Sequence, residues 1–328
     1  MRRILLFLFV LFLVVCIVRG IYIHAGSFPK KEMVLTKSKK DKKSFQHYLS
    51  EKDSLFIHEK NIFTEGWDTL AQPKFWYNVM NMSPDTMLVN VAATRSILMR
   101  IPTSYYMDKE KEERESFKDS VKKVFDLPED EEIYVTFGRS HFYRFREVMD
   151  SLNVGIDEFK KAGVNPWYAQ VILMIESPNQ LKASPVGAYG GFQLMKSIAV
   201  QYGLKVNKEQ DERVSLRKSA KAAARLIQEV CIPKAKEILA VHSIKPQEDE
   251  LWFRLMVLHV YHAGAKNVGA VVKKIKPKNG GIELIQKLWK TQHRNFGNAS
   301  QNYSQLALAS QISLDKILRE EYDLTNKL

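Results

Sequence analysis

The fold follows from residues 165–177, which read NPWYAQVILMIES. Asn165 is a residue type that caps helix N-termini, and the proline after it fits the first helical position. Residues 167–175 are apolar almost all round, so the sequence predicts a helix that is buried on every side. Ser177 precedes a proline and therefore ends this helix. Glu176 thus stands at the C-terminal end of a buried helix.

The chain beyond this helix is also helical, apart from one glycine-rich stretch. Residues 187–191 (GAYGG) favour turns, because glycine adopts backbone conformations that other residues avoid. Composition and apolar periodicity predict further helices over residues 197–202, 215–230 and 251–262. The pattern predicts a helical bundle with one glycine-rich excursion.

The N-terminus has the features of an export signal. Arg2 and Arg3 precede an apolar run over residues 4–18, which is short for a membrane span. We assign residues 1–20 to a signal peptide or membrane anchor. Cys16 also permits lipidation, although the residue before it is not the small one that lipoprotein signals have. The folded part is expected outside the cytoplasm, in the periplasm or cell envelope, with or without a membrane anchor.

Three regions flank the helical part. Residues 21–45 are polar and Lys-rich and are expected to form a solvated tether. Residues 46–150 include a strand-like run at 133–137 and a charged, helix-like stretch at 107–125. We expect this region to be a smaller, mixed α/β accessory region, whose role the sequence does not indicate. Residues 313–328 are assigned to a C-terminal tail.

Composition restricts the partners. The chain has 328 residues, 45% of them apolar, and a net charge of +13. A basic protein attracts nucleic acid, anionic lipid or acidic wall glycan. Export argues against nucleic acid, which leaves wall glycan and a peripheral or anchored membrane contact through the N-terminus. Cys16 and Cys231 form no disulfide framework, the scattered histidines lack the spacing of a metal site, and no signal indicates an oligomeric state.

Glu176 is the first candidate for a catalytic group. Burial disfavours its carboxylate form, and the negative end of the helix dipole acts in the same direction. Both effects raise the pKa of the carboxyl group. A carboxyl group that stays protonated near neutral pH is suited to general acid catalysis, for example on a glycosidic oxygen.

An ordered series of motifs follows Glu176. ASPVGAYGGFQLM stands at residues 183–195, and the later matches are LKVN, DER, KSAKAAARLI, YHAG and ASQNYSQLALAS, in that order. This series resembles the lytic transglycosylases with a lysozyme-like catalytic domain, in particular the membrane-bound murein transglycosylase D type. The resemblance covers about residues 155–312. It implies a mainly α fold, with a lysozyme-like helical catalytic domain over residues 151–312 and a small Gly-rich loop or β excursion.

The resemblance also implies the site. Glu176 would be the catalytic acid and then the base. Residues expected to support its loop or bind the substrate are Ser177, Ser184, Gly187, Tyr189, Gln193, Tyr261 and His262. The implied substrate is the glycan strand of peptidoglycan. Glycines would let the backbone approach a sugar ring closely.

The implied reaction needs one carboxyl group and neither cofactor nor metal. Ordinary glycosidases place a carboxylate on each side of the scissile bond. The motif has no second carboxylate near Glu176. In the family this fits cleavage of the β-1,4 bond between MurNAc and GlcNAc by the muramic acid 6-hydroxyl, which gives a 1,6-anhydro product.

Two departures keep other functions open. His262 stands where the family usually has Asn, and the segment from Glu176 to Ser184 is one residue shorter than usual. A non-catalytic peptidoglycan-binding or assembly protein on the same fold is therefore one alternative. A lysozyme-type hydrolase is another, if Asp211 or Glu212 supplies a second carboxylate.

Overall fold

The buried helix predicted from residues 165–177 forms as α8 (Trp167–Glu176) in the computed structural model, which describes residues 56–176, 184 and 186–325. The side chains from Trp167 to Ile175 are all buried. The Asn165 side chain accepts a hydrogen bond from the Trp167 amide at 3.0 Å, as expected of a cap. The predicted signal or anchor, the predicted tether and Ser177 lie outside the described residues.

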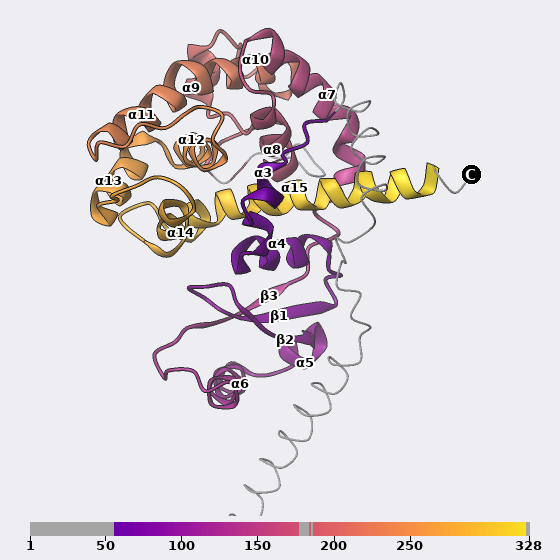
Figure 1. Ribbon diagram of the computed structural model, residues 1–328. Helices are drawn as coiled ribbons and strands as arrows, with labels where there is room; N and C mark the ends of the chain where they lie inside the picture. The colour runs from indigo at the N-terminus through magenta and orange to yellow at the C-terminus, as the bar shows by residue number, and fades with distance from the viewer. Residues whose placement is uncertain (1–55, 177–183, 185, 326–328) are drawn as a thin grey trace, which may run out of the picture. The chain divides into compact units, whose positions relative to one another are not determined.

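Two long helices pack against α8. They are α7 (Phe145–Lys161) and α15 (Asn298–Thr325), and α15 also packs against α12 (Leu251–Ala263). Figure 1 shows α15 as the long yellow helix that runs between the helical part and the sheet. The buried Gln170 on α8 donates a hydrogen bond to Gln311 of α15 at 2.6 Å. Because α8 is enclosed in this way, the end of the helix at Glu176 has a fixed position.

Shorter helices complete the bundle. They are α9 (Lys196–Gln201), η2 (Glu212–Val214), α10 (Leu216–Leu226), the π-helical η3 (Ile227–Cys231), α11 (Ile232–Ala240), α13 (Ala265–Ile275) and α14 (Ile282–Lys290). The structure confirms the helices predicted over 197–202, 215–230 and 251–262, to within a few residues at their ends. Gly203 and Gly264 end two of them with φ angles of 87° and 76°. Of the described helices, none has the length and apolar composition needed to cross a membrane.

The accessory region contains a three-stranded antiparallel sheet in the order β2-β1-β3. Its elements are α3 (Asn61–Thr64), η1 (Trp67–Thr69), α4 (Ala71–Asn81), β1 (Thr86–Val91), β2 (Ile97–Pro102), α5 (Thr103–Met107), α6 (Lys111–Val124) and β3 (Ile133–Phe137). The structure confirms the predicted strand at 133–137 and places a helix within the charged stretch at 107–125. The region is therefore mixed α/β, as expected.

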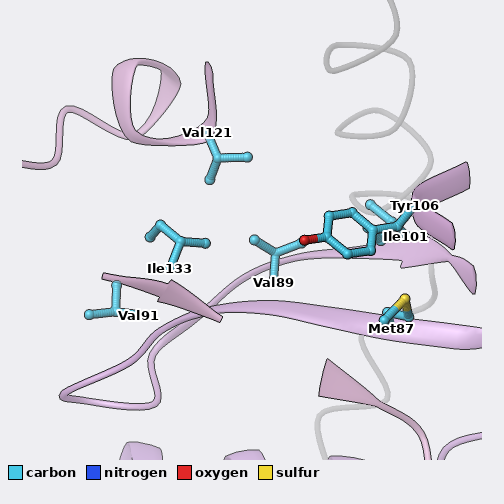
Figure 2. Packing of buried hydrophobic residues seen from close by; sticks show 7 residues of the cluster. All are labelled: Met87, Val89, Val91, Ile101, Tyr106, Val121 and Ile133. Atoms are coloured by element: carbon cyan, nitrogen blue, oxygen red, sulfur yellow. The ribbon is translucent and has the colours of Figure 1, made fainter. Parts of the chain in front are cut away.

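Strand alternation gives this sheet two buried faces. Met87 and Val89 of β1 pack with Val121 of α6 in the cluster shown in Figure 2. Leu88, between them in sequence, packs on the other face with Phe75 of α4. Since α4 packs along α15, the sheet is joined to the helical part through one helix layer.

Two expected boundaries do not coincide with the ends of elements. The boundary at residue 150 lies inside α7, and the tail expected from residue 313 continues as α15 to Thr325. Leu314 and Leu318 are buried, so apolar residues hold this last stretch against the rest of the molecule. The accessory region also shares contacts with α15, because Asn81 of α4 donates a hydrogen bond to Ser313 at 3.0 Å.

Candidate active site

Glu176 is the last residue of α8 and is partly exposed at its surface. Burial raises the pKa of its carboxyl group to about 7, and the Tyr303 hydroxyl acts in the opposite direction with a smaller effect. An unperturbed glutamate would have a pKa near 4.5. Glu176 can therefore hold a proton near neutral pH and also release it, which is the property required of one group that serves as acid and then base.

Three tyrosines lie close enough to Glu176 to sense its charge. Burial raises the pKa of Tyr303, Tyr261 and Tyr143, and the charge of Glu176 raises each of them further. The Tyr303 hydroxyl is buried and has no hydrogen-bond partner at normal distance among the described residues. It nevertheless lowers the pKa of the Glu176 carboxyl group. Of the three tyrosines, Tyr303 is the one that in turn affects the pKa of Glu176.

The glycine-rich segment folds into a tight turn opposite α12. Tyr189 and Leu194 exchange backbone hydrogen bonds of 3.1 and 3.0 Å. The Tyr261 hydroxyl of α12 donates a 2.6 Å hydrogen bond to the Phe192 carbonyl oxygen. This bond joins the turn to α12 through Tyr261, whose pKa is raised by burial and further by the charge of Glu176. The structure thus brings the predicted Glu176, Tyr189 and Tyr261 into one region.

Glycine is required at position 190 of this turn because a neighbouring backbone segment packs against it. Gly190 has a φ of 82°, and a Cβ atom there would lie 2.0 Å from the Arg213 carbonyl oxygen. At Gly191 a Cβ would lie 2.9 Å from Leu216. At these two positions the missing Cβ atom leaves room for the protein itself, and the approach of a sugar ring to these glycines remains a prediction. Gly187 has a φ of 87°, and a Cβ there would meet nothing within 4 Å, so it is the one of the three that leaves open space.

Arg213 holds the turn from the other side. Its Nη1 donates hydrogen bonds to the carbonyl oxygens of Gly187 at 2.8 Å and Leu194 at 3.0 Å. Its Nε and Nη2 bind the Asp211 carboxylate, and its guanidinium lies 5.4 Å from the Tyr189 ring centre. Arg213 is buried, so one cation fixes both ends of the glycine-rich turn.

Ser184 and Gln193 have roles within the turn in this structure. The Ser184 hydroxyl accepts a hydrogen bond from the Ala188 amide at 2.9 Å. The Gln193 side chain donates one to the Gly190 carbonyl oxygen at 3.0 Å, and Gln193 has a positive φ of 46°. These contacts agree with the expectation that Ser184 supports the loop. Contacts of either residue with a substrate remain a prediction.

His262 is exposed, and its ring stacks on Tyr303, with ring centres 4.3 Å apart. Leu255 and Leu258 of the same helix are, by contrast, fully buried. Desolvation by the protein around the ring lowers the pKa of its imidazole to about 4. His262 therefore contacts the same tyrosine whose hydroxyl lowers the pKa of Glu176.

Sequence reasoning did not assign three residues that the structure brings to this region. Tyr303 and Tyr143 interact with Glu176, and Arg213 holds the glycine-rich turn. Tyr303 lies in the ASQNYSQLALAS motif, and Arg213 lies in the DER motif, so their motifs were visible although their roles were not. Tyr143 carried no signal, because it precedes α7 in a region with no motif. All three act through packing between segments far apart in the chain, which a single sequence does not reveal.

The two alternative carboxylates are engaged elsewhere. Asp211 binds Arg213, and Glu212 accepts hydrogen bonds from Lys218 at 2.5 Å and from the Lys205 amide at 2.8 Å. These hydrogen bonds lower the pKa of both carboxyl groups. Neither has an effect on the pKa of Glu176. In the described part of the chain, no group of three or more His, Cys, Asp or Glu side chains is placed to hold a metal ion.

Comparison with known proteins gave one finding. Residues 155–282 match the family model described as the transglycosylase SLT domain. The matched segment contains Glu176, the glycine-rich turn, Arg213 and Tyr261, and it excludes the accessory sheet. This confirms the resemblance to lytic transglycosylases, whereas the D type remains a prediction. No curated protein and no solved structure gave a match.

Proposed function

Because residues 155–282 match the transglycosylase SLT domain, we propose that this protein cleaves the β-1,4 bond between MurNAc and GlcNAc in peptidoglycan and forms 1,6-anhydro-MurNAc. The observation that carries the proposal is the position of Glu176 at the end of the buried helix α8, inside the matched segment, where burial raises the pKa of its carboxyl group to about 7. A group with that pKa is populated in both protonation states at neutral pH. One residue can then serve both halves of the reaction.

The reaction proceeds without water. Glu176 donates its proton to the glycosidic oxygen as the bond from that oxygen to C1 of MurNAc breaks. The resulting carboxylate takes the proton from the C6 hydroxyl of the same MurNAc as its oxygen bonds to C1. Glu176 ends the cycle protonated, and the products are a 1,6-anhydro end and a free 4-hydroxyl group on GlcNAc.

The arrangement of the other carboxylates favours this chemistry over hydrolysis. A hydrolase that uses two carboxylates needs the second one across the scissile bond. Asp211 and Glu212 are held instead by Arg213 and by Lys218 and Lys205. We therefore assign the nucleophile to the substrate. Export to the cell envelope, predicted from residues 1–20, would bring the protein to this substrate.

Mass analysis of digested sacculi tests the proposal. Purified sacculi are incubated with the full chain, and the soluble products are separated and weighed. The proposal predicts muropeptides that end in anhydro-MurNAc, which are lighter by one water than those with a reducing end. Reducing ends would indicate a hydrolase, and undigested glycan that retains bound protein would indicate a binding protein; either result overturns the proposal.

A further inference from the structure

Arg95 is a buried cation in the turn that joins β1 to β2. Only 6% of its surface is exposed. Its Nη2 donates hydrogen bonds to the side-chain oxygens of Asn298 at 2.8 Å and Asn302 at 3.2 Å, both on α15. The guanidinium also lies over the rings of Phe75 and Tyr134, 5.3 and 5.1 Å from their centres. Arg95 therefore connects the sheet to the first turns of α15.

No carboxylate among the described residues pairs with Arg95. The hydrogen bonds of its Nη2 go to neutral amide oxygens, and Glu132 influences it only at longer range. Buried charges in proteins are usually paired with an opposite charge, because an unpaired one is costly. The position itself is also unfavourable for arginine, since its φ is 59°, in the left-handed region. A glycine would suit the backbone of the turn better, so only what the Arg95 side chain contacts can favour arginine at this position.

Two cavities meet at Arg95. One has a volume of about 280 Å³ and the other about 350 Å³. They share four lining residues, which are Arg95, Tyr134, Asn298 and Asn302. We call the two together the Arg95 pocket. Its size suits a ligand of a few amino acid units, and its amides and rings offer both hydrogen bonds and apolar contact.

The charges in the Arg95 pocket are of both signs. Arg95, Lys118 and Lys290, together with the N-terminus of α15 and its helix dipole, provide positive potential. Asp130, Glu131 and Glu132 line the smaller cavity and provide negative charge. A ligand with a carboxylate alone would meet the acidic residues, and an amine alone would meet Arg95. The arrangement fits a ligand that carries a carboxylate and an amine close together.

We propose that the Arg95 pocket binds the stem peptide of peptidoglycan, with a terminal carboxylate on Arg95 and a free amino group at residues 130–132. A stem peptide carries free carboxylates and, on its diamino acid, a free amine when it is not cross-linked. This inference rests on the proposed function for its choice of polymer. The accessory region would then recognise uncross-linked peptides attached to the glycan strand that Glu176 cleaves.

Calorimetric titration tests the Arg95 pocket. The full chain is used, and the probe is the mixture of stem peptides released from sacculi by an amidase, which contain no glycosidic bond for the protein to cleave. We expect Arg95→Gln to weaken binding at least tenfold. Arg100→Gln is the matched control, because Arg100 is exposed on neighbouring β2 and does not line the pocket, and it should bind as the parent does.

Further arms keep the test decisive. Because Arg95 is buried, thermal unfolding is used to check that Arg95→Gln is folded. A second variant combines Asp130→Asn with Glu132→Gln, two exposed positions, and should weaken binding several-fold. Peptides whose amines are acetylated should bind poorly.

Equal binding by Arg95→Gln or by acetylated peptides, or full competition by acetate, would overturn the inference. Peptide binding without anhydro products would contradict the proposed function alone, whereas anhydro products without peptide binding would contradict this inference alone.

Discussion

At the scale of single residues, the proposed chemistry depends on the environment of Glu176. Its pKa is raised by burial and lowered by the Tyr303 hydroxyl. The sequence predicted the first effect, because the apolar helix and its end at Glu176 are visible in residues 165–177. It did not predict the second effect, because Tyr303 comes from a helix near the C-terminus and reaches Glu176 only through the packing of α15 on α8.

Tyr303→Phe should shift the pH dependence of cleavage. Loss of the hydroxyl removes an effect that lowers the pKa of Glu176, so that pKa should rise above about 7. The decline in cleavage rate on the alkaline side should then move to higher pH. Rates measured from pH 5 to pH 9 for both proteins check this. A lower rate with an unmoved alkaline limb would mean that Tyr303 only supports the structure.

Glu176→Gln should stabilise the protein more at high pH than at low pH. The folded-state pKa of about 7 lies above the ordinary 4.5, so the folded state binds the proton more tightly. Stability from this group is fully present below pH 4.5 and is lost as pH rises to 7. Replacing the carboxyl group by an amide should therefore add up to about 3 kcal/mol to the free energy of unfolding at pH 8 and little at pH 4. Urea denaturation at the two pH values measures this, and an equal gain at both would refute the shift.

At the scale of elements, the glycine-rich turn shows what a sequence reveals and what it omits. The residues GAYGG predict a turn, and the structure has one. The sequence did not predict that Gly190 and Gly191 also accommodate Arg213 and Leu216. The helices of the bundle were predicted well, because their apolar periodicity is local. The continuation of α15 past residue 313 was missed, because its burial depends on partners in the accessory region.

Gly190→Ala should destabilise the protein more than Gly187→Ala. Both glycines have a positive φ, which costs an alanine about 1 kcal/mol. Only at Gly190 would the Cβ also collide with the Arg213 backbone, which should bring the total to about 3 kcal/mol or more. Free energies of unfolding from urea titration compare the two variants. Equal losses would show that the turn is not held against Arg213.

At the scale of the whole molecule, charge should govern contact with the wall. The net charge of +13 includes four exposed lysines at the end of α13 and just after it, which are Lys273, Lys274, Lys276 and Lys278. Charge screening shortens the reach of such groups to about 8 Å at physiological ionic strength. Binding of the full chain to purified sacculi should therefore weaken as salt rises.

The four lysines offer a direct comparison. Replacement of all four by Gln should reduce both the binding of sacculi at low salt and its salt dependence. The exposed Lys234 and Lys236 of α11, replaced in the same way, serve as the control for the loss of positive charge elsewhere. Pull-down of sacculi over a range of salt concentrations provides the measurement. Salt-independent binding would contradict the role of charge, and equal losses in both variants would contradict the role of this cluster.

The central claim of the proposed mechanism is that Glu176 is the single acid and base of a cleavage that forms anhydro-MurNAc. The decisive quantity is the yield of anhydro-MurNAc ends from sacculi, per molecule of enzyme, for the parent protein, Glu176→Gln and the exposed control Glu237→Gln. We predict that Glu176→Gln lowers the initial rate by about 10²–10⁴-fold, in keeping with the loss of a general acid. Glu237→Gln should match the parent, and circular dichroism should show that all three are folded. Anhydro ends formed by folded Glu176→Gln at the parent rate would contradict the mechanism.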